Sequence, residues 1–264
     1  MAYGQLDLFA GSGTSPSRQS PSAPRPSAPR PSDFDDAALL AAIPASGSTD
    51  GPVLALEAGR RRIPAAVPVL EDYCRRFAGF GTEHPLQEQI AALEALTTIG
   101  GEQAAESVAR IILRSWVQGP TLANAVAAAA RLRSRLPTNV VLLLLRHAEP
   151  AIRADACRLA RAGPDVAATL VDLLGDLHAD VSLEAAFALA RLGRAEGLPL
   201  LKRLLIEAPS ARAVDAVPQI ADEECVVQLG RIARSVSPDL AAAAREALEA
   251  TEHPRAARLL ELLR

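Results

Sequence analysis

The chain has 264 residues, of which 49% are hydrophobic, 22% are charged and only 3% are aromatic, and its formal net charge is −3. This scarcity of strand-forming and aromatic residues excludes an all-β sandwich or barrel and favours a helical protein. Proteins that hold nucleic acid through their overall field usually carry a basic face or domain. The near-neutral charge therefore predicts no strong direct nucleic-acid binding.

The first segment, residues 1–13, carries the most specific short motif of the chain, Gln5, Leu6, Asp7, Leu8 and Phe9. This pentapeptide resembles the peptide with which bacterial replication and repair proteins dock on the DNA sliding clamp. The resemblance implies that Leu8 and Phe9 fill an apolar pocket on the clamp, that Gln5 makes polar contacts at its edge, and that Leu6 packs between them. Two alternatives stay open: a chance match, and a tail that folds back onto the body.

Residues 14–32 are dominated by Pro, Ser, Ala and Arg and contain a tandem SAPRP. Closely spaced prolines favour extended polyproline II, so we expect a disordered, semi-rigid spacer. Residues 33–52 predict a short helix, 33–43, that begins at a capping box of Ser32 and Asp35 and ends at Pro44. A linker of turn-forming residues follows it.

Residues 53–264 show apolar residues at helical spacing, broken about every dozen residues by Gly, Pro or Asp. The segments 150–163 and 180–193 align without gaps, and extending their register predicts a series of helical hairpins. One apolar residue marks the first helix of each hairpin: Leu96, Leu132, Leu159, Leu189, Ile220 and Leu248. The second helices are expected at Gln103–Leu113, Asn139–Arg146, Asp165–Leu174, Ala195–Leu205, Glu224–Ile232 and Pro254–Leu263. An incomplete hairpin, 53–58 and 63–77, precedes them.

The hairpins resemble HEAT repeats, especially the short bacterial subtype that also occurs in phycobilisome-lyase proteins. The resemblance rests on Pro or Asp at the start of each first helix, on small residues where helices approach, and on terminal glycines. These residues are Ala156, Ala186 and Ala244, and Gly100, Gly163 and Gly193. It implies an all-α fold, a right-handed α-solenoid of about six to seven hairpins with a disordered N-terminal arm. Pro218 departs from the pattern and should kink its helix.

The sequence offers little catalytic chemistry. It has no nucleophile elbow, no phosphate-binding loop and no His-Glu-x-x-His motif, and we expect neither cofactor nor metal. One group of possible metal ligands, Asp172, Asp176, His178 and Asp180, is more typical of a polar turn. Cys74, Cys157 and Cys225 are expected to be buried free thiols. The longest apolar run, 140–145, is too short to span a bilayer, and the start of the chain lacks the features of a secretory signal, so we expect a cytoplasmic protein.

The second helices are expected to bring cations to one broad surface, interrupted by acidic residues. The cations are Arg110, Arg114, Lys202, Arg203, Arg231, Arg234, Arg255 and Arg258, and the acids Glu71, Asp72, Glu106 and Asp172. Such a mixed surface suits a protein partner better than a phosphate backbone. The sequence thus predicts a non-enzymatic protein-interaction scaffold, recruited to the sliding clamp through residues 5–9. The alternatives are a HEAT-like enzyme, similar to a DNA glycosylase or a bilin lyase, and a generic scaffold whose QLDLF is accidental.

Overall fold

A computed structural model describes residues 30–263 of the chain, and within this range every regular element is a helix. The proposed clamp-docking residues and most of the spacer lie outside the described residues. Two single 3₁₀ turns occur at Pro31–Asp33 (η1) and Ala195–Gly197 (η2). The α-helices are α1 Asp36–Ala45, α2 Asp50–Arg60, α3 Ala66–Arg76, α4 Gln87–Ile99, α5 Gly101–Leu113, α6 Thr121–Leu132, α7 Thr138–Leu145, α8 Pro150–Leu159, α9 Pro164–Leu173, α10 Ala179–Arg191, α11 Leu198–Glu207, α12 Ala211–Ala216, α13 Glu223–Ile232, α14 Pro238–Glu249 and α15 Pro254–Glu261.

The helices form two layers that run the length of the molecule. The even-numbered helices, from α2 to α14, each pack against the next in an unbroken series. The odd-numbered helices pack in shorter runs, in which each helix contacts the next. These runs are α1–α3–α5, α7–α9 and α11–α13–α15. This alternation is that of an all-α solenoid of HEAT-like hairpins, as the sequence predicts, because no hairpin can bury its apolar face alone.

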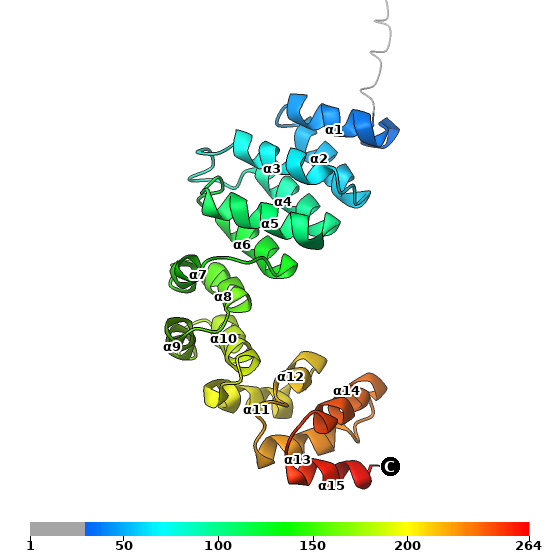
Figure 1. Cartoon of the computed structure of the whole chain (residues 1–264), viewed down its shortest axis with the longest axis vertical. Coiled ribbons are helices and arrows are strands. Elements are labelled where there is room, and N and C mark those ends of the chain that lie inside the picture. The colour runs from blue at the N-terminus through cyan, green and yellow to red at the C-terminus, as the bar shows by residue number, and fades with distance from the viewer. Residues whose placement is uncertain (1–29, 264) are drawn as a thin grey trace, which may run out of the picture.

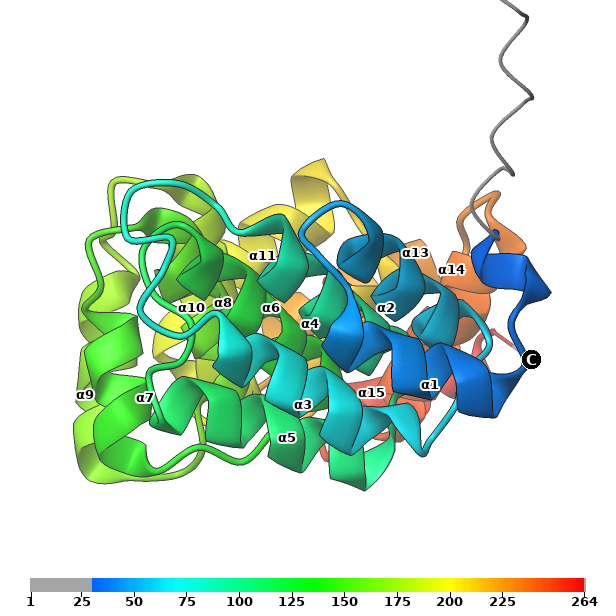
Figure 2. The ribbon, with the colours of Figure 1, turned by 90° about the horizontal axis from the view of Figure 1, so that it is seen from above.

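The array is curved, and its first helices line the inner side of the curve. In Figure 1 the two ends of the array lie to the right of its middle, where α8 and α10 face inward and α7 and α9 lie outside. Figure 2, seen from above, shows the two layers side by side, with α3 and α5 next to α2, α4 and α6, and the later repeats behind the earlier ones. The continuous packing of the even-numbered helices agrees with this, since the outer layer of a curved array is spread further apart than the inner one.

Small residues allow the first helices to stack closely. Ala156, Ala186 and Ala244 are all fully buried, as expected from the repeat pattern. A Cβ atom added to Gly59 in α2 would lie 2.6 Å from the Cα atom of Ala95 in α4. The backbones of α2 and α4 therefore approach too closely for any side chain at that position.

The three cysteines are buried in the core, as predicted, and none forms a disulfide. Burial raises the pKa of the Cys74 and Cys157 thiols to about 12 and that of Cys225 to about 11. Such thiols remain protonated at neutral pH and act as small apolar side chains. In the described part of the chain no helix is long and apolar enough to cross a membrane.

Two expectations about helix ends were wrong. The first helix begins at Asp36 and not at residue 33, because the carboxylate of Asp35 accepts the Ala38 N–H at 2.7 Å and caps the helix there. Pro218 does not kink a helix, because α12 ends at Ala216, before the proline is reached. Proline lacks the N–H that the helix would need, and the chain continues as turns.

Candidate functional site

Three of the eight cations expected on the second helices, Arg110, Lys202 and Arg255, form ion pairs with acidic residues of neighbouring repeats. Arg110 in α5 binds Glu71 of α3 through two hydrogen bonds of 2.9 and 2.7 Å. Lys202 in α11 pairs with Asp222 at 2.5 Å and with Glu224 at 2.7 Å. The surface that the sequence singled out is therefore mixed in charge, and its ion pairs join successive repeats to one another.

A different set of arginines gathers at the C-terminal ends of three successive first helices. Each of these ends carries at least one arginine, and the ends of α6 and α8 carry two or more. The set comprises Arg131, Arg133 and Arg135 at the end of α6, Arg158 and Arg161 at the end of α8, and Arg191 at the end of α10. All six side chains are exposed.

Four of these arginines line one hollow of about 450 Å³ between the ends of α6, α8 and α10. They are Arg133, Arg158, Arg161 and Arg191, and the remaining lining residues are Ala130, Ser134, Leu159 and Ala160. No carboxylate lies among these lining residues. We call this hollow the arginine groove.

Two further hollows share Arg133 with the arginine groove. One, of about 740 Å³, is lined by Arg133, Phe187, Arg212 and Asp215, and reaches as far as Ala250 beyond α14. Residues from α6 to α14 can share one hollow only on the inner side of the curve. The groove therefore belongs to the concave side of the solenoid.

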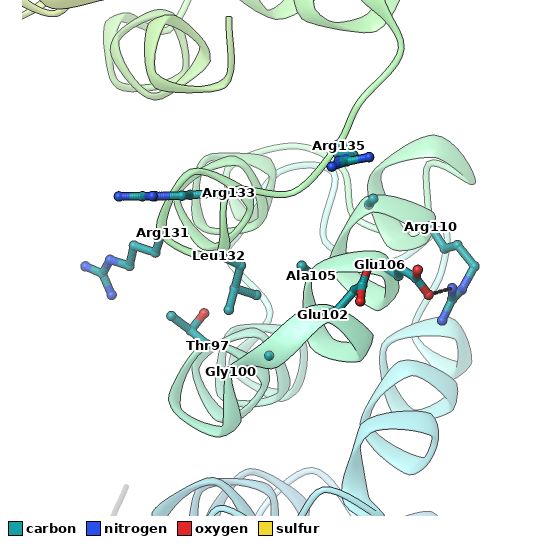
Figure 3. A pocket seen from close by; sticks show the side chains of 12 residues that line it. Thr97, Gly100, Glu102, Ala105, Glu106, Arg110, Arg131, Leu132, Arg133 and Arg135 are labelled. Carbon is teal, nitrogen blue, oxygen red and sulfur yellow. Dashed lines mark ion pairs between the residues drawn. The ribbon is translucent and has the colours of Figure 1, made fainter. Parts of the chain in front are cut away.

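The third hollow, of about 770 Å³, lies between the ends of α4 and α6 and the start of α5. Figure 3 shows Arg131 and Arg133 projecting from the end of α6 on one side, and Glu102 and Glu106 of α5 on the other. Its carboxylates mark the edge of the positive region. On its N-terminal side, the region rich in unpaired arginines therefore ends at α6.

A buried carboxylate organises the other edge of the groove. Glu184 in α10 accepts hydrogen bonds from Arg158 at 2.6 Å and from Arg212 at 2.7 and 2.5 Å. Burial alone would raise the pKa of Glu184, but the bonds from Arg212 and Arg158 outweigh it and lower the pKa. The guanidinium of Arg212 also lies 3.9 Å from the centre of the Phe187 ring. Glu184 thereby fixes two arginines from neighbouring repeats.

The side chain of Arg191, at the end of α10, reaches the end of α8. Its Nη2 donates to the carbonyl oxygens of Cys157 at 3.0 Å, Ala160 at 3.1 Å and Arg158 at 3.3 Å. Burial lowers the pKa of Arg191, the nearby Cys157 and Glu184 raise it, and the positive charges of Arg212 and Arg133 lower it. Arg212 and Arg133 thus lie close enough to repel Arg191, and an anionic ligand would relieve that repulsion.

Sequence reasoning missed this site, although a signal for it exists. Arg161 and Arg191 align at the offset of 30 residues that relates the two most similar repeats, and Arg131 and Arg158 each precede the apolar residue that marks their helix. Counting charge over long segments concealed these positions. Charge counted by repeat position would have predicted the groove.

Asp176, one of the possible metal ligands near the turn before α10, instead binds Arg153 and His178. Asp176 accepts hydrogen bonds from Arg153 at 2.8 and 2.9 Å and from the His178 N–H at 2.9 Å. In residues 30–263 no group of three or more His, Cys, Asp or Glu side chains is placed to hold a metal ion. The turn instead joins α8 to α10.

Comparison with solved structures finds several chains similar to this one. No family model and no curated protein sequence matches the chain. The structure of human deoxyhypusine hydroxylase in complex with glycerol aligns at 18% sequence identity and a TM-score of 0.37. The alignment covers 82% of this chain and 84% of that one.

This comparison corrects the expectation that the chain is not an enzyme. The similar structure is that of a hydroxylase, so a helical repeat array does not exclude catalysis, and the inference from fold to non-enzyme was wrong. The enzymatic alternative requires an aromatic ring beside a carboxylate. Phe187 and Asp215 line the same hollow, although Arg212 covers the Phe187 ring.

Proposed function

We propose that the chain is an adaptor that docks on the bacterial DNA sliding clamp through residues 5–9 and holds a second macromolecule on the concave side of its solenoid. The observation that carries the proposal is the match of all five positions of QLDLF to the clamp-docking pattern. Its two apolar anchors, Leu8 and Phe9, suit a hydrophobic pocket on a partner.

The order of segments along the chain supports this reading. A docking peptide at residues 5–9 is separated from the body by the Pro-rich segment 14–32. Proline-rich segments act as semi-rigid spacers, so a docked peptide would hold the solenoid near the clamp without burying it. Tethering of this kind raises the local concentration of whatever the solenoid binds.

The test is binding of the full-length chain to purified clamp, with the double variant Leu8→Ala/Phe9→Ala compared with the parent. We expect micromolar affinity for the parent and at least a tenfold loss for the variant, since each substitution removes an apolar anchor. A matched control is Leu177→Ala/Val236→Ala, which removes two fully exposed apolar side chains from the solenoid. Equal affinities of the parent and the first variant would contradict the proposal.

A further inference from the structure

We propose that the arginine groove binds the phosphodiester backbone of duplex DNA, without preference for sequence. The inference rests on the proposed function in one respect, that the concave side of the solenoid holds the second macromolecule. It names that macromolecule from the chemistry of the groove, and it departs from the expectation of no strong direct nucleic-acid binding, which rested on net charge.

Among the described residues, three of the four groove arginines have no carboxylate partner, whereas Arg158 pairs with Asp155 and Glu184. Within residues 30–263, Arg133 and Arg161 form no ion pair, and Arg191 binds only backbone carbonyl oxygens. Cations near a helix C-terminus are favoured by the helix dipole, which accounts for one arginine at each helix end. It does not account for Arg131, Arg133 and Arg135 together at the end of α6. A polyanion would neutralise this excess of positive charge.

The groove arginines are spread over a length that spans many phosphates of duplex DNA. Stacked helices lie about 8–10 Å apart, so the ends of α6, α8 and α10 place arginines along about 20 Å. Duplex DNA presents one charge per about 1.7 Å of its axis, or about a dozen phosphates over that length. Guanidinium groups bind phosphate oxygens in a bidentate manner, so arginine suits this ligand better than lysine does. The groove contains four arginines and no lysine.

The lining of the groove suits DNA better than an acidic protein partner. Protein interfaces depend on buried aromatic or aliphatic anchors at their centre. The apolar lining residues of the groove are Leu159 and Ala160, which are only 5% and 4% exposed, and the small, half-buried Ala130, so none offers such an anchor. Interfaces with DNA are more polar and more positive.

The form of the nucleic acid follows from the same lining. Single strands are usually held by stacking of bases on aromatic side chains. No aromatic side chain lines the arginine groove, and the ring of nearby Phe187 is covered by Arg212. A groove with guanidinium groups and no stacking platform fits the phosphate backbone of a duplex.

Acidic residues limit the positive region to the middle of the array. Toward the N-terminus, Glu102 and Glu106 follow the end of α4. Toward the C-terminus, α14 carries Glu246 and Glu249 and is followed by Glu252. The field is therefore confined to three repeats, which explains how the net charge of the chain can be negative while a DNA-binding groove exists.

The test is fluorescence anisotropy of a labelled 20-base-pair duplex with the full-length chain, over a series of salt concentrations from 50 to 200 mM. The variant Arg133→Ala/Arg161→Ala removes two exposed groove cations without breaking an ion pair. We expect at least a tenfold loss of affinity and a reduction of about 2 in the slope of log K against log salt. The matched control Arg231→Ala/Arg234→Ala removes two exposed cations at the end of α13 and should change the affinity less than threefold.

Three results would overturn the proposal. These are no binding at 50 mM salt, an equal loss in both double variants, or displacement of the duplex by polyglutamate at an equal concentration of charge. The same variants are also measured against the clamp. A groove variant that loses DNA but keeps clamp affinity supports the groove. Unchanged clamp affinity of the Leu8→Ala/Phe9→Ala variant would refute only the docking proposal, and the DNA-binding result would stand.

Discussion

Arg133 and Gly193 occupy the same position at the ends of two first helices. The Arg133 N–H donates to the Ala130 carbonyl and the next N–H donates to that of Ala129, at 3.2 and 2.9 Å. The Gly193 N–H and its successor make the corresponding bonds to Ala190 and Leu189, both at 2.9 Å. Both residues have a left-handed backbone, with φ of 54° and 71°. Glycine is the usual residue in this conformation, so the arginine is retained there at a cost.

The first prediction concerns that cost. Arg133→Gly should raise the free energy of unfolding by up to about 1 kcal/mol, because it relieves the left-handed strain, while it removes a groove cation. Gly193→Ala should lower the free energy of unfolding by about 1 kcal/mol. No atom lies near the added Cβ, so only the left-handed backbone conformation is unfavourable. Urea denaturation measures both. Destabilisation by Arg133→Gly would show that the side chain supports the fold and not a ligand.

A second prediction concerns the ion pair between Arg153 in α8 and Asp176 before α10. The Asp176 side chain is only 8% exposed, and Arg153 holds its pKa at about 2. Because the folded-state pKa lies below the unfolded value of about 3.9, the pair stabilises the fold above pH 4 and the effect disappears as the pH falls toward 2. The contribution should be about 2 kcal/mol at neutral pH.

The measurement is urea denaturation of the parent and of Asp176→Asn between pH 7 and pH 2.5. The parent should lose more stability than the variant across this window, and the two curves should converge at its acid end. Parallel curves would show that Asp176 titrates normally and that the ion pair contributes little.

A third prediction tests the close approach of α2 and α4. Gly59→Ala should lower the free energy of unfolding by about 2–3 kcal/mol, because the new methyl group would collide with the backbone of Ala95. Gly47→Ala is the control, since no atom lies within 4 Å of its added Cβ. Thermal unfolding of both variants suffices, and a tolerated Gly59→Ala would mean that the two helices can separate at little cost.

A fourth prediction follows from the buried thiols. Cys74, Cys157 and Cys225 should not react with a thiol reagent at pH 8 in the folded chain, because burial holds each pKa far above that pH. All three should react at once in denaturant. Rapid labelling of one thiol in the folded chain would show that its repeat opens locally.

Much of the fold could be predicted from the sequence because the repeat restates the same pattern several times. The second helices α5, α7 and α9 begin and end within a few residues of their expected positions, since each has a proline or glycine near its start and an apolar stripe. The unit around α12 differs because Pro218 and the turns after it outweigh the helical spacing of the apolar residues. A single proline decides the outcome there.

The arginine groove could not be read from charge counts, because its members are far apart in sequence and each looks like an ordinary helix cap. Arg133 and Arg191 are separated by two repeats, and only the stacking of α6, α8 and α10 brings them to one hollow. The sequence placed Arg110 and Glu71 on one surface, and the structure shows that Glu71 from the preceding repeat pairs with Arg110. Pairing across repeats decides which cations remain available for a ligand.

The most direct test of the whole account is whether the chain links DNA to the clamp. Clamp is fixed to beads, and retention of a short labelled duplex is measured with no added chain, with the parent, and with each double variant. The account predicts retention only with the parent and the Arg231→Ala/Arg234→Ala control, and its loss with both Leu8→Ala/Phe9→Ala and Arg133→Ala/Arg161→Ala. Retention that survives both of those variants would contradict it.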